Sequence, residues 1–223
     1  MAVLIAVWGA SPGIGKSTLC AGLSEWLSGA GLRVDHFREE EILTRPQYAA
    51  VADCFLATGR VEPAALLAAT GQFAASVLAR RIDVVVADAL MPYVPSLLAM
   101  GQSDQAIGAF ADDLAGILAP FRTAMIFLDG DAGTALMRAA AREGPGWLAW
   151  YTGKLARYRV EPEVHDAASA AEYLRRERAV TLSVARRQDW GLIVIGGATE
   201  LAPDTVLQAV RQALGPWIAA VQS

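Results

Sequence analysis

The most constraining feature of this sequence is a short glycine-containing segment near its N-terminus. Residues 10–18 read ASPGIGKST and fit the pattern [AG]-x4-G-K-[ST], with Ala10 in the place usually held by the first glycine. The segment follows an apolar run at 3–8 and precedes a helical pattern at 16–28. Glycines in such a loop let backbone N–H groups point inward and approach phosphate oxygens closely. We therefore expect a strand, a phosphate-binding loop and a helix, in that order.

The residues of this loop have distinct expected parts in holding a nucleoside triphosphate. A helix that begins near Gly15 offers its positive end to the phosphates. Lys16 is expected to reach the β- and γ-phosphates, and the Ser17 hydroxyl is expected to ligate Mg²⁺. The residues predicted to bind the nucleotide are Ser11, Gly13, Ile14, Gly15, Lys16, Ser17 and Thr18. The alternative, a glycine-rich turn with an incidental lysine, does not explain the strand before it and the helix after it.

Short continuous apolar runs alternate with longer helical patterns along the whole chain. The runs lie at 3–8, 32–37, 82–87, 124–128 and 192–195, and helical patterns include 16–28, 63–80, 104–118 and 134–142. Continuous hydrophobicity is typical of strands that are covered on both faces, as in parallel sheets. The alternation predicts a three-layer α/β sandwich with a five-stranded parallel sheet and right-handed crossovers. We expect one domain over 1–223, with a lid and helical segment at about 138–188.

Composition and charge exclude several classes of protein. The chain has 223 residues, of which 54% are hydrophobic and 19% charged, which excludes intrinsic disorder. With 19 Lys and Arg against 23 Asp and Glu, the net charge is −4, which disfavours a nucleic-acid partner. The longest apolar stretch, 64–79, is too short and too polar to span a bilayer. Two cysteines allow no disulfide framework and no cysteine-rich zinc site, and the two histidines are not at metal-ligand spacing. We predict a cytoplasmic protein without a membrane partner.

Acidic residues follow two of the predicted strands, at the edge where open parallel sheets bind their ligands. Asp88 ends the run at 82–87 and is expected to hold Mg²⁺; a turn or helix-capping aspartate is the alternative. Glu39, in the acidic run 39–41, is the best-placed group to accept the proton of an attacking hydroxyl. A solvated helix start explains this acidic run equally well, and Asp35 is a further option for the base.

Arginines and aromatic residues gather in the later part of the chain. Arg138 and Arg142 are four residues apart and share a helix face before a Gly-Pro-Gly turn. They are expected to neutralise charge on a transferring phosphoryl group, and ordinary surface arginines are the alternative. Trp147, Trp150 and Tyr151 form an aromatic stripe, which core packing explains better than stacking on a base or acceptor ring.

Other charged residues of this part have structural explanations. Asp129 and Asp131 follow the fourth predicted strand, and we expect them to shape a turn and cap the next helix. Arg175, Arg178 and Arg186 are expected on a solvated helix face.

In the order of its motifs, the chain resembles the thymidylate kinase and deoxynucleoside kinase branch of the P-loop kinases. HFREEE, with Arg38 and Glu39, resembles the Arg-Glu-Pro segment that follows the second strand of that family. FLDGDAGTALMRAAAREG resembles its fourth strand and arginine-bearing lid, and DWGLIVIGGATELAPDTVLQAVRQAL its last strand and C-terminal helix. The resemblance implies a fold of the nucleotide kinase type, ATP and Mg²⁺ as cofactors, and a homodimer.

Two departures from this family concern the substrate that accepts the phosphoryl group. In thymidylate kinases an arginine follows the aspartate that corresponds to Asp88, and another lies in the preceding long helix; here these positions hold Ala89 and Gly71. Both family arginines hold the phosphate of the acceptor, and each charge-assisted contact contributes about 1.5–3 kcal/mol. The residues that could compensate are Arg38, Arg45 and Arg60.

These observations predict a Mg²⁺- and ATP-dependent kinase that phosphorylates a hydroxyl of a nucleoside-like or other small metabolite. Lys16, Glu39, Arg138 and Arg142 are its predicted catalytic residues, and Ser17 with Asp88 its metal ligands. Two alternatives stay open. One is a divergent thymidylate or other nucleoside monophosphate kinase with relocated arginines. The other is an ATP-binding regulatory protein without a small acceptor.

Overall fold

Five parallel strands form a single sheet at the centre of the computed structural model, which describes residues 1–88, 93–188 and 190–222. The strands are β1 (Val3–Gly9), β2 (Val34–Phe37), β3 (Val84–Asp88), β4 (Arg122–Leu128) and β5 (Gly191–Ile195). Their order across the sheet is β2-β3-β1-β4-β5, and every neighbouring pair is parallel. The predicted five-stranded parallel sheet is therefore confirmed, and its strands start and end within two residues of the predicted apolar runs.

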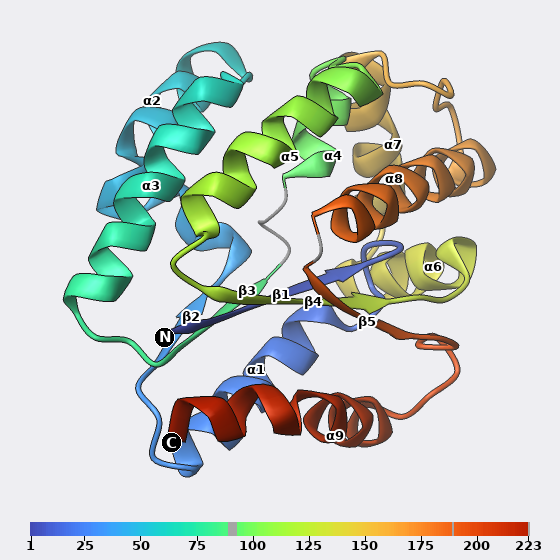
Figure 1. The fold of residues 1–223 in the computed structure, drawn as a ribbon. Helices are drawn as coiled ribbons and strands as arrows, with labels where there is room; N and C mark the ends of the chain where they lie inside the picture. Colours follow the sequence, from blue (N-terminus) through green and yellow to red (C-terminus); the bar gives the residue numbers. More distant parts are fainter. Residues whose placement is uncertain (89–92, 189, 223) are drawn as a thin grey trace.

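Helices cover both faces of the sheet, which gives the three predicted layers (Figure 1). One face carries α1 (Lys16–Gly29) and α9 (Pro203–Gln222), which pack against each other. The other carries α2 (Ala49–Thr58), α3 (Pro63–Ala79), α4 (Val94–Ala99), α5 (Asp104–Leu118) and α8 (Ala167–Arg187). Two short 3-10 helices, η1 (Glu39–Leu43) and η2 (Pro46–Tyr48), follow β2. The helices predicted at 16–28, 63–80 and 104–118 are present, whereas α2 and α4 were not predicted.

Two further helices lie beyond the carboxyl ends of the strands. They are α6 (Ala132–Glu143), which follows β4, and α7 (Trp147–Tyr158), which follows the glycine-rich turn. Together with α8 they account for the segment predicted at about 138–188. In the part of the chain that the structure describes, no helix combines the length and the apolar character that crossing a membrane requires.

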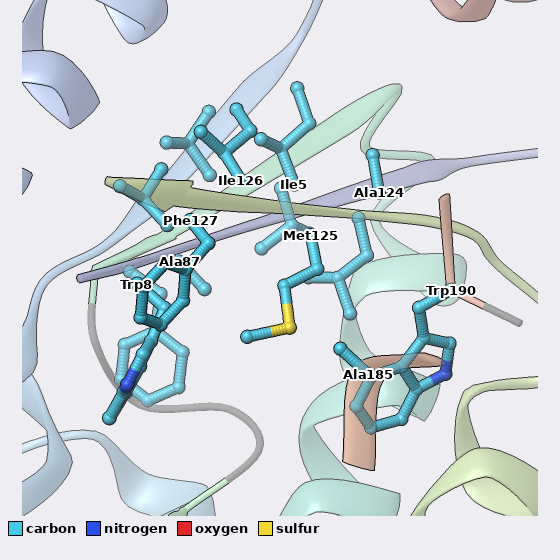
Figure 2. Packing of buried hydrophobic residues seen from close by; sticks show 14 of the residues in the cluster. Ile5, Trp8, Ala87, Ala124, Met125, Ile126, Phe127, Ala185 and Trp190 are labelled. Carbon is cyan, nitrogen blue, oxygen red and sulfur yellow. The ribbon is translucent and has the colours of Figure 1, made fainter. Parts of the chain in front are cut away.

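The main core lies on both faces of the sheet, because side chains of a strand alternate between its two faces. Figure 2 shows Ile5 and Ile126 on one face, and Met125, Phe127 and Trp190 on the other. Every residue of β1 is buried. Complete burial of a valine, leucine or isoleucine side chain stabilises the folded state by about 1.5–3 kcal/mol, so packing holds this central strand in place. This burial explains the continuous apolar run at 3–8.

A second, smaller core joins the helices beyond the carboxyl ends of the strands. It contains buried residues from α6, α7 and α8, among them Leu136, Leu155, Tyr173 and Leu174. This cluster is separate from the main core, although α4, α6 and α8 have residues in contact with both. The site described below lies between these two packed regions.

Candidate active site

The glycine-containing segment forms a tight loop between β1 and α1, at the carboxyl edge of the sheet. Gly13 and Gly15 have φ angles of 81° and 104°, in the left-handed region that favours glycine. A Cβ atom on Gly13 would overlap the carbonyl oxygen of Ala135 and lie 2.8 Å from the backbone nitrogen of Ala139, both in α6. Around Gly15 there is open space, so its backbone angle alone requires glycine. Close packing of α6 therefore holds the loop in its curved shape.

Of the seven predicted nucleotide-binding residues, all but Ile14 line a cavity in front of this loop. The Lys16 ammonium group donates a hydrogen bond to the carbonyl oxygen of Ser11 at 3.1 Å, so its side chain folds back over the loop. Helix α1 begins at Lys16 and has no acidic residue in its first turn. Its positive end is therefore not neutralised and is available to an anion. Ser17 and Thr18 are exposed at this end, Ser11 is buried in the cavity wall, and Ile14 is buried in the main core instead.

The predicted metal ligands lie together beside the loop. Asp88 is only 4% exposed at the end of β3, and its Oδ1 atom has no hydrogen-bond partner among the described residues. Its negative charge adds to burial in raising the pKa of the Cys20 thiol, which places it against the first turns of α1. Asp88 and Ser17 line the same cavity of about 590 Å³. A hydroxyl and an unpaired carboxylate oxygen fit Mg²⁺, which takes few protein ligands when it also binds phosphates.

A larger cavity of about 730 Å³ opens in front of the phosphate loop. Its walls come from the loop itself, η1, the ends of α2 and α4, the last turn of α6, and the inner faces of α7 and α8. It reaches from Lys16 to residues far along the chain, including Trp147 and Glu177. One continuous space therefore joins the loop to the helices beyond the sheet.

Glu39 lies in the wall of the larger cavity, at the start of η1. Solvent reaches its side chain through the cavity, but the surrounding protein desolvates the carboxylate and raises its pKa. The Lys16 charge opposes this rise, and the Asp88 charge adds to it. A raised pKa makes a carboxylate a better acceptor for a proton. The acidic run starts a helical turn, as the helix-start interpretation predicted. It also brings Glu39 to the cavity, as the interpretation of Glu39 as a base requires.

Asp35 and Arg45 form a buried ion pair behind the cavity. Asp35 accepts a hydrogen bond from Arg45 at 2.7 Å and another from Arg80 at 3.0 Å. Arg45 also binds Glu41 at 2.7 Å, and its guanidinium lies 4.2 Å from the centre of the Phe37 ring. Asp35 is not in the cavity wall, so it is badly placed for the base. Arg45 is fully engaged with carboxylates and is badly placed to bind a phosphate.

The other candidate phosphate-binding arginines also lie outside the larger cavity. Arg60 donates a hydrogen bond to the carbonyl oxygen of Met100 at 3.1 Å, and Arg38 lines the smaller cavity beside Asp88. Gly71 lies in α3 outside the cavity wall, and Ala89 lies outside the described residues. None of the arginines that could replace the family pair lines the larger cavity.

The structure separates the two predicted catalytic arginines of α6. Arg142 lines the larger cavity near the phosphate loop and pairs with Glu143 at 2.7 Å. Arg138 is exposed and is not part of the cavity wall. The reason is the packing of α6, which turns Ala135 and Ala139 toward the loop and leaves Arg138 on the outward side.

The aromatic stripe of α7 faces the larger cavity. The rings of Trp147 and Tyr151 stack with centroids 5.1 Å apart and an angle of 8° between their planes. Trp150 is 53% exposed, and the Lys154 ammonium lies 5.5 Å from the centre of its ring. All four side chains line the cavity, which differs from the prediction of core packing, although Trp147 and Tyr151 also touch the second core.

A hydrogen bond closes the cavity between two helices that are distant in sequence. The hydroxyl of Tyr158, the last residue of α7, donates to the carbonyl oxygen of Gly59 at 3.1 Å, just after α2. Both residues line the cavity. The aromatic wall is thus tied to the opposite side of the molecule.

The charged residues before and within α8 differ in part from their predicted roles. The Asp131 carboxylate accepts a hydrogen bond from the Thr134 backbone at 2.7 Å and caps α6, as predicted. Asp129 binds Arg178 instead, at 2.7 Å, and this ion pair lowers the pKa of Asp129. Arg178 is therefore not on a purely solvated face, and it ties α8 to the edge of the sheet.

Sequence reasoning missed Glu177, a buried acid in the cavity wall on α8. It is only 8% exposed, and burial raises its pKa to about 7, with a further rise from Glu39 and an opposing effect of Lys16. In the sequence it sits within RRERAV, which resembles a solvated helix. Helical spacing could have revealed it, because position 177 falls on the same face as the buried residues Tyr173, Leu174 and Thr181. The sequence analysis also missed Lys154 of α7, which lines the same cavity.

Comparisons with known proteins support the fold and leave the function open. Neither the family models nor the sequences of curated proteins match this chain. Among solved structures, the thymidylate kinase from Ehrlichia chaffeensis is similar over 96% of this chain and 98% of that chain, with a TM-score of 0.56 and 14% identity. This likeness shows that the chain has a divergent fold of the P-loop kinase type.

Proposed function

We propose that this protein is a Mg²⁺- and ATP-dependent kinase that transfers the γ-phosphoryl group to a hydroxyl of a small, unphosphorylated acceptor. The observation that carries the proposal is the single cavity that joins Lys16 and the phosphate loop to Glu39 and the aromatic wall of α7. A phosphate loop by itself supports only nucleotide binding. A carboxylate and a flat apolar wall in the same space support binding of a second, smaller substrate.

The donor nucleotide would be held at the loop end of the cavity. Backbone N–H groups of residues 11–18 and the positive end of α1 would bind the phosphates. The Lys16 ammonium would give up its hydrogen bond to Ser11 and contact the phosphates instead. Ser17 and the unpaired Asp88 oxygen would hold Mg²⁺, which supplies charge neutralisation at the phosphates when bound. Arg142 would add positive charge from the last turn of α6.

Glu39 would act as the base on the acceptor side. As the acceptor oxygen forms its bond to the γ-phosphorus, the Glu39 carboxylate takes the hydroxyl proton. The bond between the γ-phosphorus and the bridging oxygen breaks, and ADP leaves with that oxygen. The walls formed by Trp147 and Tyr151 would exclude water, which would otherwise compete with the acceptor.

The charges of the cavity favour an acceptor without a phosphate. Among the described residues, the cations in its wall are Lys16, Arg142 and Lys154. The first two are at the loop end, and Lys154 is close enough to Glu39 to influence its pKa. Lys16 and Arg142 would contact the donor phosphates, and the charge of Glu39 offsets that of Lys154. Little positive charge would therefore remain to bind a phosphate on the acceptor.

A nucleoside monophosphate kinase is the second candidate. One solved structure with a similar fold is a thymidylate kinase, and Lys154 could take over part of the work of the missing arginines. The ATP-binding regulatory protein, the homodimer, the cytoplasmic location and the single domain stay predictions.

The test is ADP release from Mg·ATP in the presence of nucleosides, their monophosphates, sugars and polyols, with Lys16→Ala as the blank. Stimulation by unphosphorylated acceptors supports the proposal. Stimulation by monophosphates alone favours the second candidate. Tight ATP binding with a change of oligomeric state, and no stimulation by any acceptor, favours the regulatory protein.

A further inference from the structure

We infer that Glu177 is a specificity-determining residue of the acceptor site. It selects a hydrogen-bond donor on the acceptor, a hydroxyl or ammonium group, and rejects a phosphate or carboxylate at the same place. The inference rests on the proposed function in one respect, because it takes the cavity opposite the phosphate loop as the acceptor site. It adds the chemical class of the group that this site recognises.

The first observation is that Glu177 lines the cavity and that no described residue pairs with its carboxyl group. Its side chain is buried in the cavity wall, and among the described residues none forms a hydrogen bond or ion pair with its carboxyl group. A buried acid without a partner destabilises the folded state. Three arginines of α8 are paired elsewhere, namely Arg176 with Asp104, Arg178 with Asp129, and Arg187 with Asp112. Stability of the fold therefore does not explain an acid at position 177.

The second observation is that two buried polar atoms, one on α8 and one on β1, have no hydrogen-bond partner among the described residues. Thr181 lies one turn further along α8 on the same face as Glu177, and its Oγ1 atom has no hydrogen-bond partner among the described residues. The same holds for the indole nitrogen of Trp8, a residue in the cavity wall. Figure 2 shows Trp8 on the face of the sheet that carries Ala185 of α8, with its indole nitrogen pointing away from the strands. Such groups are normally satisfied, so the indole nitrogen of Trp8 fits a polar ligand or water, whereas Thr181 does not line the cavity.

The third observation is the charge that faces Glu177. Glu39 raises its pKa and Lys16 lowers it, so both lie within electrostatic range. Of the two charged groups that shift the pKa of Glu177, only Glu39 stays free once Lys16 binds the donor phosphates. An anionic group between two carboxyl groups would be repelled. An ammonium can donate hydrogen bonds to both carboxyl groups and a hydroxyl to one of them, and the ring of Tyr151 offers an apolar surface beside them.

The experiment uses matched ligands that differ in one group only. One set is thymidine, 5′-amino-5′-deoxythymidine and dTMP; the other is glucose, glucosamine and glucose 6-phosphate. Binding to the full chain is measured by calorimetry with Mg·ADP present, so no transfer is needed. Glu177→Gln keeps the shape of the side chain and removes its charge, and Glu177→Met is a second variant. Glu172→Gln, exposed on the same helix, is the matched control.

We expect the hydroxyl or amino member of at least one set to bind at least tenfold more tightly than its phosphate member. In the Glu177 variants this preference should fall at least tenfold, and in Glu172→Gln it should not change. A preference for the phosphate member, an unchanged preference in both Glu177 variants, or no binding in either set would overturn the inference. The same samples are assayed for ADP release from Mg·ATP. Binding preference without release would refute the kinase and leave the inference standing.

Discussion

The two walls of the larger cavity are built in different ways. The phosphate loop is one continuous segment between a completely buried strand and a helix, and its shape is fixed by backbone angles and close packing of α6. The wall formed by α7 and α8 brings together Trp147 and Glu177, and a separate small core positions it. The first wall is specified by local sequence, whereas the second depends on packing between distant segments. A phosphate-binding loop at one wall is thus combined with a ligand surface that is built independently at the other.

The largest expected effect comes from removing the cation of the loop wall. Lys16→Ala should lower phosphoryl transfer at least about 1000-fold, because charge on the transferring group would lose its closest partner. The free energy of unfolding should change by less than about 0.5 kcal/mol, since Lys16 is partly exposed and its only protein hydrogen bond in the described part of the chain is to Ser11. ADP release and a urea titration measure the two quantities.

Lys154→Ala is the matched change on the other wall. It should alter the KM of the acceptor more than the KM of ATP. If both variants changed the KM of ATP equally, the two walls would not differ in this way.

This contrast also explains how much of the molecule could be predicted from the sequence. The loop, the strands and α5 depend on neighbouring residues, and α5 begins and ends at the predicted residues. The capping role of Asp131 is local in the same sense. By contrast, Arg138 and Arg142 have the same local pattern, and only the packing of α6 decides that one of them reaches the cavity. Glu177 could be recognised only by relating helical spacing to burial.

Glu39 connects the two walls, and its substitution has the next largest expected effect. Glu39→Gln should lower kcat about 1000-fold if the carboxylate takes the acceptor proton, with little change in the affinity for ATP. Glu41→Gln is the control from the same acidic run, because Glu41 binds Arg45 and does not line the cavity. Rapid-quench kinetics with the best acceptor separates the chemical step from binding. A kcat for Glu39→Gln within tenfold of wild type would rule out its role as the base.

The buried acid of the α8 wall should make stability depend on pH. The pKa of Glu177 is about 7 in the folded protein, against 4.5 for an ordinary glutamate. Below pH 4.5 both states hold the proton; as the pH rises through 7, the folded state loses the stability that proton binding contributes. Relative to wild type, Glu177→Gln should therefore become more stable from pH 5 to pH 8, by up to about 3 kcal/mol.

Urea titrations at pH 5 and pH 8 measure this difference. Glu172→Gln on the same helix should show no such trend, since its side chain is exposed. If the free energies of unfolding of Glu177→Gln and wild type differ by the same amount at both pH values, Glu177 is not desolvated in the folded protein. The two walls would then not differ in electrostatics.

The smallest expected effect concerns the hydrogen bond that ties α7 to the end of α2. Tyr158→Phe keeps the ring and removes the donor to the Gly59 carbonyl, which should lower the free energy of unfolding by about 1 kcal/mol. Because α7 is held by the small second core, amides in Trp147–Tyr158 should exchange with solvent faster in the variant, while those of β1 should not change. Hydrogen exchange measured by mass spectrometry distinguishes the two regions. If β1 and α7 respond equally, the aromatic wall unfolds together with the sheet, and the two walls of the cavity form one cooperative unit despite their different construction.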